Sequence, residues 1–192
     1  MFFIKVLIFI AKPIVNFYYK LKLQGMENYI YDKPFVLVSN HKSMMDPIVL
    51  FVNMPRKMKF MAKKELFDNK ILAFILRKVG AFPVNRGKND IAAIKTAMKV
   101  LKDGEVLGIF PQGTRVEDGQ QTQAKTGAFL IASKCNVPVL PVSIKGNYKF
   151  RSQISIKVLE PYYFEDKKYT TEELSEISND IFNKILDYAE VK

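Results

Sequence analysis

The sequence predicts an α/β fold, a single domain with a mostly parallel central sheet flanked by helices. Short apolar runs typical of buried strands alternate along the chain with segments of helical periodicity. The chain has 192 residues, of which 48% are hydrophobic, and these values suit one domain with a substantial core. We therefore expect an α/β domain over residues 23–192, preceded by a separate helical segment over residues 1–22.

The first half of the domain is expected to alternate strand and helix. The apolar run FVLV is typical of a short buried strand. The pair Asp46-Pro47 favours a helix start, since Asp is common at the N-cap and Pro at the first helical position. Gly80 marks the end of the following helical segment. The predicted elements are strands at 35–38, 59–62 and 81–84, and helices at 46–52 and 66–79.

The second half continues the alternation and adds a long C-terminal helix. Apolar residues at helical spacing follow Asn89, which is expected to cap a helix, and they stop at Gly104, which is expected to end it. The other predicted elements are strands at 105–110, 139–144 and 154–159, the last two paired with each other, and helices at 126–134 and 171–189.

Residues 1–22 have the pattern of a strongly apolar helix with one polar stripe, formed by Lys5, Lys12, Asn16 and Lys20. Two lysines interrupt the run of about 20 apolar residues that a spanning helix needs. The segment also has no small-residue cleavage site typical of a signal peptide. The pattern favours an interfacial helix whose apolar face enters the membrane surface while its lysines reach the headgroups.

Pro13 is expected to kink this helix or divide it in two. The alternative to membrane contact is a helix that packs on its own domain. The net charge of +11 suits nucleic acid, an anionic membrane surface or a phosphorylated substrate as partner. No helix-turn-helix, zinc or RNA-binding pattern accompanies the charge, so we expect no nucleic-acid partner.

The chain has one cysteine and one histidine, which limits its chemistry. A single cysteine, Cys135, excludes a disulfide within the chain and suits a reducing, cytoplasmic setting. Cys135 lies at the expected end of a helix, where we interpret it as a structural thiol, with a nucleophile as the alternative. No Cys/His cluster can form, so no metal site is expected.

The single histidine, His41, lies just after the first expected strand and five residues before Asp46. In α/β sheets, ligand sites gather beyond the carboxyl ends of strands. A neutral imidazole accepts a proton near pH 7, and a carboxylate on its other nitrogen fixes the tautomer. The spacing works if His41 lies in a loop and Asp46 begins the next helix, with Asn40 and Ser43 holding the turn. The alternative is a surface histidine beside an N-cap aspartate.

The sequence offers this histidine no obvious nucleophile to activate. Neither Ser39 nor Ser43 lies in a G-x-S-x-G elbow. A histidine base without an enzyme nucleophile activates a hydroxyl of the substrate. The residues therefore favour direct transfer to an acceptor alcohol.

Basic residues follow two later strands. In FPQGTR, Gly113 lets the backbone approach an anion, and Thr114 and Arg115 can donate to phosphate oxygens. Arg86 follows the third expected strand in the same way, and residues 56–64 add five cations. An ordinary loop with a solvated arginine is the alternative. No P-loop pattern is present, so nucleotide binding by that route is not expected.

Four ordered blocks resemble the glycerolipid acyltransferase family, whose bacterial members acylate lysophosphatidic acid. Each block alone is a weak or moderate signal, but four in order at family-like spacing are strong, and the resemblance covers about residues 22–160. The blocks are Asn40-His41 with Asp46 (N-H-x-x-x-x-D), Gly80, Phe82 and Arg86 (similar to G-x-x-F-x-x-R, with Phe one position earlier), Phe110 to Arg115 (F-P-E-G-T-R) and Val137 to Val142 (V-P-[IV]-[IV]-P-V).

The resemblance implies acyl transfer from acyl-CoA or acyl carrier protein to the sn-2 hydroxyl of lysophosphatidic acid, which gives phosphatidic acid. It implies that His41 is the general base and that Asp46 orients it. It implies no metal and no bound cofactor. The implied phosphate-binding residues are Lys63, Arg86, Gly113, Thr114 and Arg115, and the implied supporting residues are Asn40, Ser43 and Gln112.

The resemblance also implies a peripheral or monotopic protein on the cytoplasmic face of the cell membrane. One position departs from the family pattern, since Gln112 stands where the family usually has Glu. Gln keeps hydrogen-bonding capacity but loses the negative charge. Two other functions remain open: an acyltransferase that uses glycerol-3-phosphate or another lysophospholipid, and a non-catalytic protein that binds anionic lipids.

Overall fold

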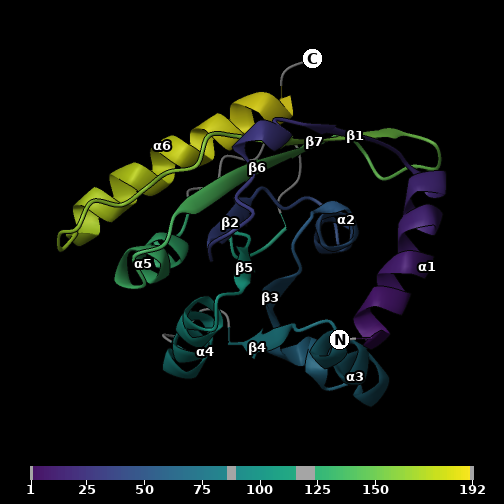
Figure 1. Cartoon of the computed structure of the whole chain (residues 1–192), viewed down its shortest axis with the longest axis horizontal. Helices are drawn as coiled ribbons and strands as arrows, with labels where there is room; N and C mark the ends of the chain where they lie inside the picture. The colour runs from purple at the N-terminus through teal and green to yellow at the C-terminus, as the bar shows by residue number, and fades with distance from the viewer. Residues whose placement is uncertain (1, 86–89, 116–123, 191–192) are drawn as a thin grey trace.

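A seven-stranded sheet forms the centre of the molecule, in the order β1-β7-β6-β2-β5-β3-β4 (Figure 1). The computed structural model describes residues 2–85, 90–115 and 124–190. Strands β2 to β6 pair in parallel, whereas β7 runs antiparallel to β6 and parallel to β1. This confirms the predicted α/β fold. The strands are β1 (Lys20–Gln24), β2 (Val36–Ser39), β3 (Met58–Lys63), β4 (Phe82–Val84), β5 (Val106–Ile109), β6 (Val139–Lys145) and β7 (Gln153–Val158).

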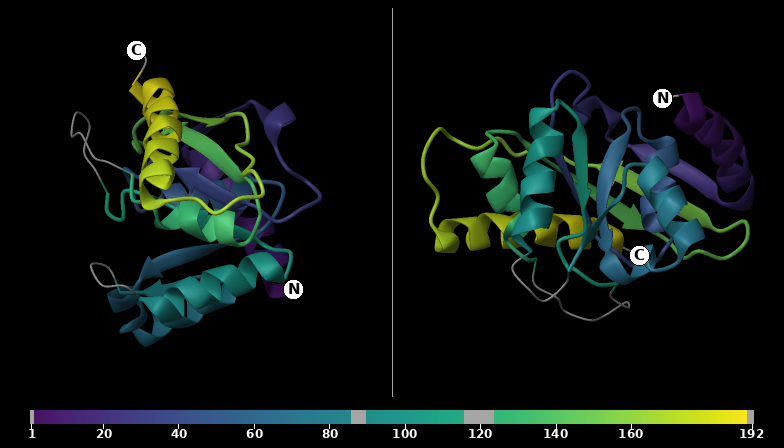
Figure 2. Two further views of the ribbon diagram at one scale, coloured as in Figure 1. Left: turned by 90° about the vertical axis from the view of Figure 1, so that its left-hand side faces the viewer. Right: turned by 90° about the horizontal axis from the view of Figure 1, so that it is seen from below.

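Helices cover both faces of the sheet, and the sheet separates two hydrophobic cores. One core includes residues of α1 and α2, and the other includes residues of α4, α5 and α6, on the opposite side of the sheet in Figure 1. α1 and α5 lie at opposite ends of the molecule, as Figure 1 and the right panel of Figure 2 show. The helices are α1 (Phe2–Tyr18), η1 (Met26–Asn28), α2 (Asp46–Asn53), η2 (Lys64–Phe67), α3 (Lys70–Lys78), α4 (Ile91–Lys102), α5 (Gly127–Lys134) and α6 (Thr171–Glu190).

The central strand β2 is buried on both faces, which explains its continuous apolar run. Leu37 belongs to one core, and Val36 and Val38 belong to the other. Successive side chains of a strand point to opposite faces, so a strand covered by helices on both sides is apolar at every position.

Two predicted helix starts are corrected by the capping residues. The helix expected over 66–79 is divided into η2 and α3, because the Asn69 side chain accepts two backbone N–H bonds at 3.0 Å and begins a new helix. The N-cap of α4 is Asp90, whose Oδ1 accepts a backbone N–H bond at 3.0 Å. The expected cap, Asn89, lies outside the described residues.

The N-terminal helix is shorter than predicted and is followed by a strand that the sequence did not reveal. α1 ends at Tyr18, and Lys20 begins β1, so Lys20 does not belong to the polar stripe of the helix. α1 continues through Pro13, so the expected division there is wrong; a proline removes only one backbone donor. The boundary expected between residues 22 and 23 falls within β1.

One side of α1 packs on the domain, and its outer side is apolar and exposed. Ile8, Ala11 and Val15 contact the core, whereas Phe9 is 81% exposed. Among the described helices, none is long and apolar enough to cross a membrane. The two interpretations of this segment are therefore compatible, since the helix packs on its own domain and still presents an apolar surface. The large exposed apolar residues of α1 are Val6, Phe9, Ile10, Ile14, Phe17 and Tyr18.

Candidate active site

The parallel pairing of β2 with β5 places two loops side by side. Val38 of β2 pairs with Ile109 of β5. His41 follows Val38 by three residues, and Gln112 follows Ile109 by three residues. The two loops therefore leave the same edge of the sheet at the same level, and they are joined by a hydrogen bond of 2.8 Å from the backbone N–H of His41 to Oε1 of Gln112.

His41 and Asp46 form a buried pair beyond the end of β2. Nδ1 of His41 lies 2.8 Å from Oδ2 of Asp46, and the Asp46 residue is 1% exposed. The same carboxylate oxygen accepts the backbone N–H groups of Lys42 and Ser43, each at 2.7 Å. Asp46 is also the first residue of α2, where the helix dipole favours a negative charge. The loop thus turns back on itself around one carboxylate, as predicted.

This hydrogen bond fixes the chemistry of the imidazole. With Asp46 ionised, Nδ1 of a neutral His41 carries the proton and donates a hydrogen bond to the carboxylate. Nε2 then holds a lone pair and can accept a proton from a hydroxyl group. The geometry therefore supports the expected pairing of a general base with an orienting carboxylate.

Asn40 ties the histidine loop to the neighbouring strand β6. Its side chain donates to the carbonyl oxygen of Ile144 and accepts from the N–H of the same residue, each at 2.8 Å. Asn40 is 1% exposed. A paired amide supplies one donor and one acceptor to an extended backbone, which Asp or Leu cannot do. This asparagine therefore joins the start of the loop to β6, whereas the sequence predicted that its side chain would hold the turn between His41 and Asp46.

Gln112 acts in the structure as a hydrogen-bond acceptor for the histidine loop. Gln112 is buried, with 8% of its surface exposed. Its Oε1 accepts a hydrogen bond from the backbone N–H of His41. A carboxylate oxygen of Glu would fill the same role. The bond itself does not require a negative charge, so this contact is compatible with Gln where the resembling family usually has Glu.

We expect Gln112→Ala to lower the free energy of unfolding by about 1–3 kcal/mol, because it leaves the buried N–H of His41 without its acceptor. We expect Gln112→Glu to keep the rate of the acyl transfer that the sequence resemblance implies within about fivefold of the parent, since the acceptor oxygen is retained. Thermal melts and thiol-release rates of both variants test this. A loss of activity in Gln112→Glu as large as that in Gln112→Ala would contradict the bracing role.

Aromatic rings form an apolar wall beside His41. The imidazole stacks on Phe110 with centroids 4.2 Å apart and an interplanar angle of 20°, and Phe110 stacks on Phe60 at 5.8 Å. Gly108 makes room for this stack, because a Cβ there would lie 2.3 Å from the Phe60 ring. The wall limits water at one side of the imidazole and offers apolar surface to a substrate.

The predicted phosphate-binding residues lie along the same edge of the sheet. Gly113 has φ 72°, and Thr114 and Arg115 follow it on the surface beyond β5. Lys63 ends β3, which is the next strand in the sheet, and its Nζ lies 3.3 Å from a carboxylate oxygen of Glu65. Arg86 lies outside the described residues.

The sequence did not single out Lys125, which lies against the same turn. A Cβ added at Gly113 would lie 3.0 Å from Nζ of Lys125, and the backbone N–H of Lys125 donates to Pro111 at 2.9 Å. A further cation therefore lies beside the glycine turn. Its sequence signal was weak, since it follows the loop by ten residues and has no motif around it.

Tyr148 is the second residue that sequence reasoning missed. Its hydroxyl donates a hydrogen bond to Oδ1 of Asp46, the carboxylate oxygen that does not face His41. Burial raises the pKa of the Tyr148 phenol well above its ordinary value, and the Asp46 carboxylate raises it further. Tyr148 lies 102 positions beyond Asp46 along the chain, so no local pattern in the sequence could connect them.

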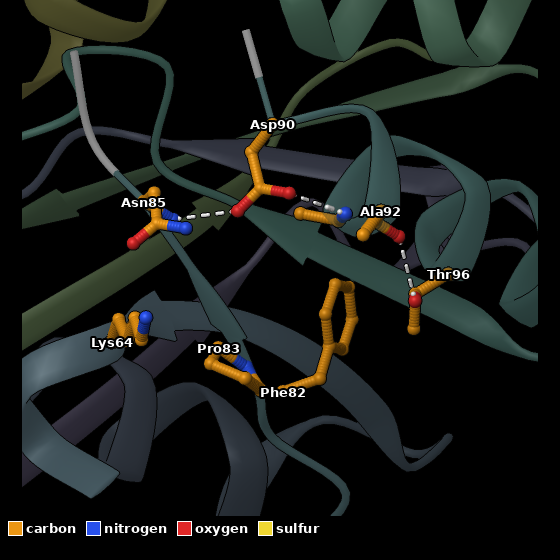
Figure 3. Close-up of a pocket in the computed structure, with 8 residues that line it drawn as sticks. Lys64, Phe82, Pro83, Asn85, Asp90, Ala92 and Thr96 are labelled. Atoms are coloured by element: carbon orange, nitrogen blue, oxygen red, sulfur yellow. Dashed lines mark hydrogen bonds between the residues drawn. The ribbon is translucent and has the colours of Figure 1, made fainter. Parts of the chain in front are cut away.

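A separate pocket lies between β4 and α4, two strands away from β5 in the sheet (Figure 3). Asp90 connects two other lining residues, since its carboxylate accepts hydrogen bonds from the backbone N–H of Asn85 at 2.8 Å and that of Ala93 at 3.0 Å. These bonds lower the pKa of the Asp90 carboxyl. The lining residues are Lys64, Phe82, Pro83, Asn85, Asp90, Ala92, Ala93 and Thr96, and His41 is not one of them.

Within residues 2–85, 90–115 and 124–190, no group of three His, Cys, Asp or Glu side chains is placed to hold a metal ion. Cys135 is half-buried at the C-cap of α5, and burial raises the pKa of its thiol. A raised pKa disfavours the thiolate, which fits the structural interpretation of this cysteine.

The family model, the sequence relatives and the solved structure that match this chain are all described as acyltransferases. The family model described as "Acyltransferase" matches residues 20–145. The 1-acyl-sn-glycerol-3-phosphate acyltransferase of Bacillus subtilis (strain 168) is 40% identical over 126 residues, which are 65% of this chain and 62% of that protein. The protein of the same name from Streptococcus pneumoniae is 37% identical over 126 residues, 65% of this chain and 46% of that protein. The match thus spans less than two thirds of the length of these relatives.

A solved structure matches over nearly the whole chain. The crystal structure of the 1-acyl-sn-glycerophosphate (LPA) acyltransferase PlsC from Thermotoga maritima superposes with a TM-score of 0.76 and 27% sequence identity. The superposition covers 98% of this chain and 81% of the other. The similarity therefore includes α1 and α6, which lie outside the residues matched by the family model.

Proposed function

This chain belongs to the acyltransferase family, and on that premise we propose that it transfers an acyl group from a thioester to the sn-2 hydroxyl of lysophosphatidic acid, giving phosphatidic acid. The observation that carries the proposal is the buried His41–Asp46 pair at the carboxyl edge of the sheet. The names of the relatives in Bacillus subtilis and Thermotoga maritima support lysophosphatidic acid as the acceptor.

In the proposed reaction, Nε2 of His41 takes the proton of the acceptor hydroxyl as its oxygen attacks the thioester carbonyl carbon. Asp46 stabilises the imidazolium that forms. The tetrahedral intermediate then collapses, the carbon–sulfur bond breaks, and the imidazolium returns its proton to the leaving thiolate. The products are the ester and the free thiol, so protons balance with no metal or bound cofactor. The donor is acyl-CoA or acyl carrier protein.

We assign the acceptor phosphate to the edge formed by the ends of β5 and β3. Thr114 and Arg115 are exposed there, and Arg can bind two phosphate oxygens at once. Gly113 lets the backbone approach the anion, and Lys63 adds positive charge from β3. Arg86 completes the proposed set from its place after β4 in the sequence.

The function is tested by measuring thiol release from acyl-CoA and from acyl carrier protein with a panel of acceptors. The proposal expects release that depends on lysophosphatidic acid, with phosphatidic acid as product and little turnover of monoacylglycerol, which has no phosphate. Release with glycerol-3-phosphate or another lysophospholipid instead would change the acceptor and keep the chemistry. No release with any pair, alongside intact vesicle binding, would favour the lipid-binding alternative.

We further propose that α1 attaches the protein to the anionic, cytoplasmic surface of the cell membrane as a peripheral protein. Its outer side presents large apolar side chains such as Phe9, Ile14 and Phe17, which are 81%, 60% and 66% exposed. Exposed apolar surface of this kind typically marks an interaction site. The net charge of +11 adds attraction to anionic lipids.

We expect the triple variant Phe9→Ser, Ile14→Ser, Phe17→Ser to weaken binding to phosphatidylglycerol vesicles at least about 100-fold, since each apolar side chain that enters lipid contributes about 1.5–3 kcal/mol. Sedimentation with the vesicles measures this. The control replaces Ile71, Phe74 and Ile75 of α3, which are also exposed and apolar, by serine. Equal losses in both variants would show that the attachment is not specific to α1.

A further inference from the structure

The Asp46 carboxylate is held by two sets of donors from two parts of the chain. Oδ2 accepts from His41 and from the backbone of its own loop. Oδ1 accepts from the hydroxyl of Tyr148, which lies in the connection between β6 and β7. The first set holds one oxygen and the hydroxyl of Tyr148 holds the other, so the two together limit rotation of the carboxylate about its Cβ–Cγ bond.

The position of Tyr148 is itself determined by the end of α1. Its ring meets Tyr19 edge to face, with centroids 5.4 Å apart and an interplanar angle of 87°. Tyr19 directly follows α1 and is 5% exposed. Tyr148 packs against the same core as Tyr19 and Val15 of α1. The phenol is therefore held between the N-terminal helix and the carboxylate.

The whole connection that carries Tyr148 is attached to α1. The N–H of Arg151 donates to the carbonyl of Tyr18 at 2.7 Å, and the N–H of Lys20 donates to the carbonyl of Ser152 at 2.9 Å. The ring of Phe150 packs against Tyr18 with centroids 5.0 Å apart. Figure 1 shows this connection beside the end of α1 where the chain enters β1. Backbone and side-chain contacts thus join the same two segments.

We propose that Tyr148 is a positioning residue that orients Asp46, and through it His41, and that the end of α1 holds Tyr148 in place. The phenol stays protonated in the working pH range, so it is always a donor to Oδ1. A carboxylate with both oxygens held cannot rotate away from Nδ1 of His41. The assignment rests on the proposed acyl transfer, because its kinetic arm needs that reaction.

The test is Tyr148→Phe, which removes the hydroxyl and keeps the ring that packs on Tyr19. We expect kcat for acyl transfer to fall about 3- to 30-fold, with KM for the acceptor unchanged, because the lost bond is one to a charged group and does not touch substrate. The matched control is Tyr29→Phe. It removes another buried tyrosine hydroxyl, which accepts from the N–H of Arg56 at 3.2 Å, in the same core.

A second measurement does not depend on activity. His41 is the single histidine of the chain, so its imidazole nitrogens give one set of ¹⁵N signals that need no assignment. We expect the parent and Tyr29→Phe to show the tautomer with the proton on Nδ1, and Tyr148→Phe to show an increased share of the Nε2–H form. An unchanged tautomer together with an unchanged kcat in Tyr148→Phe would overturn the proposal.

The two measurements also separate this inference from the proposed function. If the parent releases no thiol with any acceptor, the proposed function fails, and the ¹⁵N signals still decide whether Tyr148 orients the pair. If the parent is active and Tyr148→Phe behaves like Tyr29→Phe in both measurements, the hydroxyl contributes only to stability and the positioning role is wrong.

Discussion

His41→Ala is expected to lower the rate of acyl transfer by about 10²–10⁴-fold, the contribution typical of a general base. The reason is geometric. Nδ1 of His41 is engaged by Asp46, which leaves Nε2 as the nitrogen that can take the hydroxyl proton. Alanine removes that acceptor and also the ring that stacks on Phe110. The measurement is thiol release with saturating lysophosphatidic acid, so that the change appears in kcat.

The interpretation of this variant depends on intact folding and substrate binding. His41→Ala should bind vesicles like the parent and stay folded, with a lower melting temperature because the buried Asp46 carboxylate loses one donor. The loop remains held, since Gln112 accepts from its backbone and Asn40 binds the backbone of Ile144 in β6. His41→Gln is the second variant, since it keeps a polar side chain of similar reach but is not basic. Normal turnover in either variant would end the assignment of His41 as the base.

Much of the fold and the paired site could be predicted because both depend on local patterns. Strand β2 begins with the apolar run Val36-Leu37-Val38, and Asp46-Pro47 is a strong helix start, so the loop that carries His41 was placed correctly between them. The His41–Asp46 contact spans five residues, a separation that one turn of chain can close. Chemistry and spacing within one loop were therefore sufficient.

The features that were missed depend on contacts between distant segments. Tyr148 meets Asp46 across 102 positions. Gln112 was expected to support the site, but its contact with His41, 71 positions away, was not foreseen. Only the order of the strands brings these residues together. Strand β1 was missed for a different reason, since its sequence KLKLQ reads as the end of a basic helix and becomes a strand only by pairing with β7. Its charged side chains suit an exposed sheet edge.

The N-terminal segment shows how one sequence pattern can be compatible with two interpretations, of which the structure shows packing on the domain. A helix that is apolar nearly all round can pack one side on its own domain and still present another side outward. Ile8 and Val15 take the first role, and Phe9 and Phe17 are exposed. Periodicity could not decide between packing and exposure, because it cannot show which part of the apolar surface the domain covers.

Asp46→Asn is expected to lower kcat about 100-fold, because the amide carries no negative charge to stabilise the imidazolium, and hydrogen bonds to charged groups contribute about 1.5–3 kcal/mol. Asn has one acceptor oxygen and one NH₂ donor in place of two acceptor oxygens. The backbone N–H groups of Lys42 and Ser43 and Nδ1 of His41 all meet Oδ2, so the amide oxygen takes that place and the proton stays on Nδ1. The NH₂ group takes the place of Oδ1, which faces the hydroxyl of Tyr148.

The matched control for this change is Asp90→Asn. Asp90 is also a carboxylate at the start of a helix that accepts two backbone N–H bonds, and it lies in the pocket beside β4 and α4. Both substitutions remove a charged acceptor, so both should lower the melting temperature, but only Asp46→Asn should lower activity, and the ¹⁵N signals of His41 should keep the Nδ1–H form in both. Equal activity in the two variants would mean that Asp46 stabilises the loop without acting on the base. A shift of the signals to the Nε2–H form in Asp46→Asn would place its effect on the tautomer of the ring and not on the charge of the imidazolium.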